Sequence, residues 1–87
     1  IRKEPVDLSE LVEEVIERNR PLFESSSNQV IFHGSGPVRG EWDRLRLEQV
    51  ITNLFTNAMR YGNGKPVQIR VDEQDGHARL VVRDQGM

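Results

Sequence analysis

Two asparagines four residues apart, Asn53 and Asn57, lie in a segment whose apolar spacing otherwise predicts a packed helix. Asparagine is a mediocre helix former because its amide competes for backbone hydrogen bonds. At about 100° per residue, both amides share one stripe of the helix with Arg46, Gln49 and Arg60. An amide oxygen is a hard, neutral ligand for Mg²⁺ that adds no repulsion beside phosphate oxygens, and a guanidinium binds phosphate directly. The stripe therefore has the chemistry of a magnesium–phosphate site.

A structural interpretation of the same stripe stays open at this point. In it, Asn53 and Asn57 are half-buried amides that hydrogen-bond neighbouring backbone, and Arg60 is an ordinary surface residue. The spacing of two asparagines alone does not decide between the two interpretations. The opposite face of the helix is expected to be buried, and it carries Leu47, Val50, Ile51, Leu54, Phe55 and Ala58.

A second candidate group lies near the end of the chain, in the segment "HARLVVRDQGM". Asp84 has the same strand phase as Leu80 and Val82, which predicts a carboxylate on the side of the sheet that packs against the helices. Such a carboxylate needs donors, because burying it unpaired costs several kcal/mol. Gly86 then permits close approach of a ligand to the backbone. An acceptor beside bare backbone suits the exocyclic amine of adenine, although an Asp that caps a turn is the simpler alternative.

The elements that position these residues follow from local signals. Asp7 is placed to cap a helix over roughly residues 8 to 24, which Pro21 should kink or break, and Asp43 is placed to cap a helix that runs to about Tyr61. Short strands are expected in "QVIFHGS" and "GPVRGEWD", with a Gly-Pro turn between them. The clearest hairpin spans "PVQIRVDEQDGHARLVVRD".

This order of elements predicts an α+β fold. Antiparallel hairpins in place of βαβ crossovers indicate a two-layer α/β sandwich, with two helices packed on one face of a mostly antiparallel sheet. The 87 residues are enough for one small domain. Hydrophobic residues make up 36% and charged residues 30% of the chain, which fits a globular domain, not a disordered one.

The same composition excludes several classes of protein and site. The net charge of -2, with acids and bases interspersed and no basic stripe, argues against a nucleic-acid partner. The absence of cysteine excludes disulfides and thiolate metal sites. No apolar run reaches the roughly 18–20 residues of a membrane span. Because the chain starts at Ile1 and stops at Met87 after "DQG", we expect it to be part of a longer protein.

The combination of these motifs is more specific than its parts. "RLRLEQVITNLFTNAMRYGNGKPVQIRV" followed by "LVVRDQG" closely resembles the ATP-binding catalytic domain of two-component sensor histidine kinases, a family that shares its fold with gyrase, the Hsp90 chaperone and MutL. "EPVDLSELVEEVIERNRPLF" is similar to the family's first strand and helix. The resemblance covers residues 1–87 and implies an incomplete sandwich of the histidine-kinase ATPase (Bergerat) type. Residues 43–61 would be its N box and residues 84–87 the start of its first glycine motif.

The resemblance also implies roles for single residues. Asn57 would coordinate Mg²⁺ on the triphosphate of ATP, and Asn53 would support the metal and the phosphates. Arg60 matches a position that contacts phosphate. Tyr61 matches the aromatic that flanks the nucleotide, with packing at a helix end as its alternative. Asp84 and Gly86 match the residues that receive the adenine, although "YGNG" replaces the Ser/Thr-Pro step that is commoner after the tyrosine.

One position favours a kinase over an ATPase. In hydrolysing relatives the residue at the place of Asn53 is a glutamate that acts as general base on water, and an amide cannot do so. The resemblance therefore implies a protein that holds ATP for a histidine on a separate dimerisation domain, in a membrane-anchored bacterial sensor whose catalytic part is cytoplasmic and which serves a response regulator. His33 and His77 do not resemble that histidine and are expected to be strand-edge and turn residues.

The family pattern continues beyond residue 87 with a further glycine, a mobile lid and a second glycine-rich motif. Since those parts cover the nucleotide, we expect the 87 residues alone to bind ATP weakly or not at all. An exposed sheet edge would favour self-association as a homodimer or exchange of elements. Two alternatives stay open: a non-catalytic, self-associating fragment, and the related anti-sigma-factor serine kinase domain.

Overall fold

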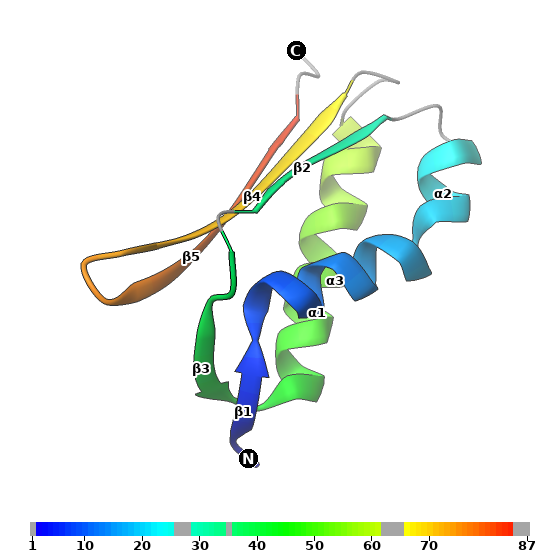
Figure 1. Cartoon of the computed structure of the whole chain (residues 1–87). Helices are drawn as coiled ribbons and strands as arrows, with labels where there is room; N and C mark the ends of the chain where they lie inside the picture. Colours follow the sequence, from blue (N-terminus) through cyan, green and yellow to red (C-terminus); the bar gives the residue numbers. More distant parts are fainter. Residues whose placement is uncertain (1, 26–28, 35, 62–65, 85–87) are drawn as a thin grey trace.

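The computed structural model describes residues 2–25, 29–34, 36–61 and 66–84, without the side chains of Tyr61 and Asp84. Three helices pack on one face of a sheet, and a second, smaller sheet lies beside the start of the first helix (Figure 1). The elements in chain order are β1 (Glu4–Asp7), α1 (Leu8–Arg18), α2 (Arg20–Ser25), β2 (Val30–Gly34), β3 (Arg39–Trp42), α3 (Arg44–Tyr61), β4 (Val67–Gln74) and β5 (His77–Asp84).

The two sheets combine two pairings of distant segments, β1 with β3 and β2 with β4, with the hairpin of β4 and β5. β1 and β3 form an antiparallel pair, in which Val6 lies opposite Gly40. The larger sheet has the order β2-β4-β5, with β2 parallel and β5 antiparallel to β4. The β4–β5 hairpin turns at Asp75 and Gly76, whose φ angles of 54° and 77° are those of the two-residue turn that Asp-Gly favours. The expected hairpin in this region is therefore confirmed.

The core lies between the larger sheet and the helices. Val67, Ile69 and Val71 alternate along β4 and are fully buried, which fixes the face of the sheet that the helices cover. Phe23 of α2 and Phe55 of α3 are buried together, with ring centroids 5.9 Å apart and planes inclined at 58°. α1 adds its own buried stripe, formed by Leu8, Leu11, Val12, Val15 and Ile16.

The caps expected from the sequence are present. Asp7 Oδ1 accepts hydrogen bonds from the backbone N–H groups of Ser9 (3.0 Å) and Glu10 (3.4 Å), and from that of Val38 (3.2 Å). One carboxylate thus caps α1 and holds the segment that leads into β3. The expected helix break also occurs, but at Asn19, whose buried side-chain amide donates to the Val15 carbonyl at 2.8 Å. Pro21 lies in the first turn of α2, where its missing N–H costs no helical hydrogen bond.

Two expectations about the fold are wrong in detail. The strands of residues 30–42 do not pair with each other: β2 joins β4 in parallel after the α3 crossover, and β3 joins β1. The larger sheet is therefore mixed. The expected two-layer α+β sandwich is confirmed, and the break in the first predicted helix gives three helices among the described residues. The buried face of α3 is also narrower than its apolar pattern predicts, because Val50 and Leu54 are 49% and 38% exposed. In the described part of the chain, no helix is long and apolar enough to cross a membrane.

Candidate functional site

α3 presents the two asparagines and Arg60 to solvent. The helix begins after Asp43, whose Oδ1 accepts from the Arg46 backbone N–H at 3.2 Å. This hydrogen bond is the main cause of a pKa of Asp43 below its usual value. Burial of Ile51, Phe55 and Ala58 against the core then fixes the rotation of the helix. The opposite side of α3 is thereby held toward water.

The residues of the predicted stripe lie together on that side. Asn53, Asn57 and Arg60 are all exposed, at positions i, i+4 and i+7 of one helix. With a rise of about 1.5 Å per residue, Asn57 lies about 6 Å and Arg60 about 10 Å along the axis from Asn53. Neither asparagine side chain hydrogen-bonds any residue that the structure describes, whereas Thr56 Oγ1 on the same helix donates to the Thr52 carbonyl at 2.9 Å. The two amides are thus not the half-buried, backbone-bonded groups of the structural interpretation.

A hollow of about 450 Å³ borders the stripe at Asn53. One wall is the ion pair between Arg18 of α1 and Glu48 of α3, whose Nη1 and Oε1 atoms are 3.0 Å apart. Glu48 also lies 3.4 Å from Arg44, which in turn pairs with Glu14 of α1. This ionic cluster ties α1 to α3 beside the hollow. The residues that line the hollow are Arg18, Leu45, Glu48, Gln49, Thr52 and Asn53.

The backbone places Asp84 at the same end of the sandwich as the end of α3. Asp84 is the last residue of β5 and lies opposite Val67 in the antiparallel register. Val67 begins β4, six residues after Tyr61 ends α3, and α3 packs against β5. Figure 1 shows the ends of α3 and β5 on one side of the molecule. The side chains of Tyr61 and Asp84, and the whole of Gly86, lie outside the described residues.

Comparison with known proteins places this arrangement in a family. Residues 42–87 match the family model described as "Histidine kinase-, DNA gyrase B-, and HSP90-like ATPase". The chain belongs to this ATPase family. The matched range contains the whole of α3, with both asparagines and Arg60, together with Asp84 and Gly86.

Proteins similar to this chain include sensor histidine kinases. The sensor histidine kinase MtrB of Mycolicibacterium paratuberculosis (strain ATCC BAA-968 / K-10) is 29% identical over 85 residues, which are 97% of this chain and 15% of MtrB. The mycobacterial sensor histidine kinase MprB superposes with a TM-score of 0.83 at 31% identity, over 99% of this chain and 56% of that one. The catalytic domain of the histidine kinase ThkA superposes with a TM-score of 0.88 at 24% identity, over 94% and 57%. The chain thus spans little more than half of the solved domains.

The described residues of the chain hold no cluster of three or more His, Asp or Glu side chains that would bind a metal. A magnesium site built on amide oxygens and phosphate needs no such cluster. His33 lies on β2, an edge strand of the three-stranded sheet, and His77 is the first residue after the β4–β5 turn. Both histidines are exposed, at the strand-edge and turn positions expected for them.

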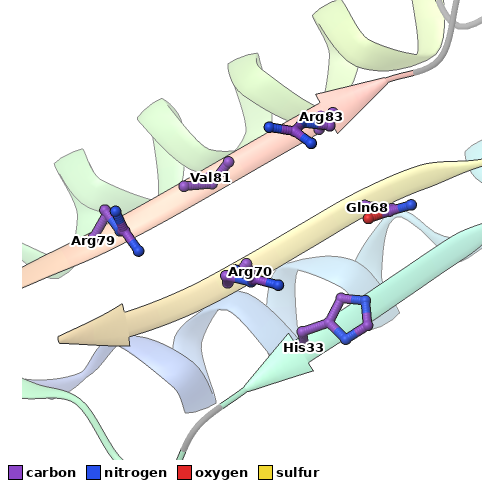
Figure 2. Close-up of a pocket in the computed structure, with 6 residues that line it drawn as sticks. All are labelled: His33, Gln68, Arg70, Arg79, Val81 and Arg83. Carbon is purple, nitrogen blue, oxygen red and sulfur yellow. The ribbon is translucent and has the colours of Figure 1, made fainter. Parts of the chain in front are cut away.

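One feature of the surface was missed in the sequence. A second hollow, of about 200 Å³, lies on the face of the larger sheet opposite the helices and is shown in Figure 2. Three arginines contribute to it from two strands. Arg70 alternates with buried residues on β4, and Arg79 and Arg83 share one face of β5, so part of the signal was in the sequence. Only the register of β4 with β5 shows that these arginines lie together. The lining residues are His33, Gln68, Arg70, Arg79, Val81 and Arg83.

Proposed function

We propose that this chain is the N-terminal portion, residues 1–87, of the ATP-binding catalytic domain of a two-component sensor histidine kinase. The parent protein would hold Mg-ATP and present its γ-phosphate to a histidine on a separate domain. The observation that carries the proposal is the exposed stripe of Asn53, Asn57 and Arg60 on α3, whose amides are left without protein partners by the described residues. The stripe lies within the residues that match the ATPase family.

The metal and phosphate contacts are assigned to the stripe. The Asn57 amide oxygen would ligate Mg²⁺, and Asn53, one turn earlier, would support the metal and the phosphates. Mg²⁺, when bound, supplies positive charge that neutralises the phosphate oxygens during transfer. Arg60 would add a guanidinium about 4–5 Å further along the helix axis, which suits hydrogen bonds to phosphate. Because the helix is anchored by buried Phe55 and Ala58, these side chains keep their spacing without a ligand.

The nucleoside contacts are assigned to the ends of α3 and β5. The Asp84 carboxylate would accept the exocyclic amine of adenine, Gly86 would allow close approach of the base to the backbone, and Tyr61 would flank the nucleotide. The backbone register supports this assignment, since it carries residue 84 to the end of the sandwich where α3 stops. The segment from residue 43 to 61 would serve as the N box, and residues 84–87 would begin the first glycine motif.

Phosphoryl transfer to another protein fits the site better than hydrolysis. Asn53 occupies the place where a general base would be needed, and an amide cannot accept the proton of an attacking water. The nucleophile would instead be the histidine of a dimerisation domain in the parent protein, which would pass the phosphoryl group to a response regulator in the cytoplasm. Two similar solved proteins support a nucleotide ligand and a response-regulator partner. Full-length ShkA was solved in complex with AMPPNP, and ThkA was solved in complex with the response regulator protein TrrA.

The 87 residues are expected to bind Mg-ATP weakly at best, because they span 56–58% of several solved domains. A non-catalytic fragment that associates with itself is the second candidate, and the exposure of Leu45 (68%) and Val50 (49%) favours it. Sedimentation separates the two ideas: a clean monomer at all concentrations would remove the self-association proposal.

The test joins the chain at residue 87 to the residues that follow the aligned segment of MprB. We expect this extended chain to bind Mg-ATP at least tenfold more tightly than the 87 residues, by calorimetric titration. Asn57→Ala should abolish that gain with an unchanged melting temperature. Thr56→Ala is the matched control on the same helix, because the Thr56 hydroxyl is already bonded to the Thr52 carbonyl. Equal losses in the two variants would contradict the assignment of Asn57.

A further inference from the structure

The helix-free face of the β2-β4-β5 sheet carries a concentration of arginine. Strand alternation that buries Val67, Ile69 and Val71 sends the intervening residues of β4 to the opposite face. The same alternation on β5 sends Arg79, Val81 and Arg83 there. Figure 2 shows the side chains that line this hollow, which come from three neighbouring strands. We call the residues Arg70, Arg79 and Arg83 the arginine face.

Only part of this positive charge is neutralised by the described residues. Asp72 lies opposite Arg79 in the register and accepts two hydrogen bonds from it, at 2.9 Å and 2.8 Å. These bonds, and to a lesser degree the charge of Arg70, hold the pKa of Asp72 below its usual value. Arg70 and Arg83 have no ion pair with any described residue. Three guanidinium groups and one carboxylate leave a local excess of two positive charges on a chain whose net charge is -2.

The three arginines of this face are spread along the strands and do not converge on one position. Arg79 and Arg83 are four residues apart on β5, which corresponds to about 13 Å along an extended strand. Arg70 lies between them on the neighbouring strand, opposite Val81. The hollow between these side chains has a volume of only about 200 Å³. A single small anion would reach one or two of the guanidinium groups, whereas a chain with repeated carboxylates would reach all three.

We propose that the arginine face is a docking surface for an acidic polypeptide segment, separate from the nucleotide site. In an extended segment, alternate residues lie on one side about 6–7 Å apart, so carboxylates at i, i+2 and i+4 span the distance from Arg79 to Arg83. Guanidinium groups bind carboxylates through paired hydrogen bonds. Among the described residues that line the hollow there is no Phe, Tyr or Trp on which bases could stack, which disfavours a single-stranded nucleic acid.

The test uses the ¹⁵N-labelled 87-residue chain and an octapeptide of alternating Glu and Thr. We expect the peptide to shift the backbone amides of residues 68–72 and 79–83, with binding that weakens as salt rises from 0.05 to about 0.3 M. Arg70→Gln combined with Arg83→Gln should weaken binding by roughly two- to thirty-fold, the range for two exposed ion pairs. Arg79 is left in place because its removal would free Asp72. The matched double variant is Arg2→Gln with Arg39→Gln, which removes the same charge from exposed sites elsewhere and should change binding less than about twofold.

Control variants distinguish a loss of charge from a loss of folding, and control ligands distinguish an acidic peptide from other anions. Arg70→Lys with Arg83→Lys keeps the charge but loses the paired hydrogen bonds of guanidinium, so it should weaken binding less than the Gln double variant does. Melting temperatures verify that each variant is folded. An octapeptide of alternating Gln and Thr should not bind. The proposal is overturned if this neutral peptide binds as well, if the two Gln double variants behave alike, or if the shifts lie elsewhere. It is also overturned if inorganic phosphate binds the face as tightly as the peptide, or if an oligothymidine octamer binds more tightly.

Discussion

Phe55 and Leu54 are neighbours in a helix whose sequence pattern predicts that both are buried, and the structure separates them sharply. Phe55 is 0% exposed and packs on Phe23, whereas Leu54 is 38% exposed. Truncation of Phe55 to alanine should therefore remove a large fraction of the stability of the domain. The same truncation of Leu54 should remove little. The contrast tests the rotation of α3, on which the position of the asparagine stripe depends.

The expected size of the effect follows from the burial of each side chain. Phe→Ala in a core costs about 3–5 kcal/mol, because the transfer free energy of the ring is lost and a cavity remains. A chain of 87 residues has a free energy of unfolding of roughly 4–13 kcal/mol. Phe55→Ala should thus lower the melting temperature by about 12 °C or more. Leu54→Ala, at a partly exposed position, should cost about 1 kcal/mol or less.

Urea unfolding followed by circular dichroism measures both free energies in one experiment. Phe23→Ala provides a check, because it removes the other ring of the pair and should cost a similar amount to Phe55→Ala. The reasoning would be refuted if Leu54→Ala destabilised the chain as much as Phe55→Ala. Such a result would mean that α3 is rotated about its axis relative to the structure, and that Asn53 and Asn57 do not share the solvent side.

Three further predictions concern the framework around the site. Asp7→Ala should lower the free energy of unfolding by about 0.5–2 kcal/mol in urea titrations, because Asp7 Oδ1 caps α1 and also accepts from the Val38 backbone N–H. Asp7→Asn should cost less, because its amide oxygen can still accept these hydrogen bonds. Gly40→Ala should destabilise the β1–β3 pair and shift the emission of Trp42, the single tryptophan, because an added Cβ would lie 2.6 Å from its ring. The pKa of Asp72, measured by NMR, should lie below that of an unfolded aspartate. Its contribution to stability is therefore present above about pH 4 and is lost as the pH falls through the folded value. Arg79→Gln should remove most of this contribution, because the hydrogen bonds from Arg79 are its largest cause.

Local signals in the sequence were sufficient for most of the elements. The caps at Asp7 and Asp43 and the Asp-Gly turn of the β4–β5 hairpin each depend on residues within a few positions, and all are present. The helix break was expected at Pro21 and occurs two residues earlier. Asn19 ends α1 there with its own side chain, which lets the proline occupy the first turn of α2.

Long-range pairing was not accessible in the same way. Nothing in the pattern of residues 30–42 distinguishes a hairpin from two strands that pair with β4 and β1, because alternation reports only that a strand has two unlike faces. The apolar pattern of α3 likewise shows which residues are hydrophobic but not what covers them, so Val50 and Leu54 were assigned to the core. The arginine face was missed for the same reason, since it exists only once β4 and β5 are in register.

The asparagine stripe was accessible because helical spacing alone brings Asn53, Asn57 and Arg60 to one side. Strand phase predicted that Asp84, at the end of β5, lies on the side of the sheet that faces the helices. The observed register places residue 84 at the end of the sandwich where α3 ends. The roles of Asp84, Gly86 and Tyr61 remain proposals that depend on the family.

The most direct test of the account is the dissociation constant of Mg-ATP for the extended chain, measured by calorimetry with and without Asn57→Ala. We predict saturable binding in the unchanged protein, no measurable binding in Asn57→Ala, and the same melting temperature for both nucleotide-free proteins. Binding that is equally tight in Asn57→Ala, in a protein that is still folded, would contradict the claim that this amide holds the metal and phosphates of ATP.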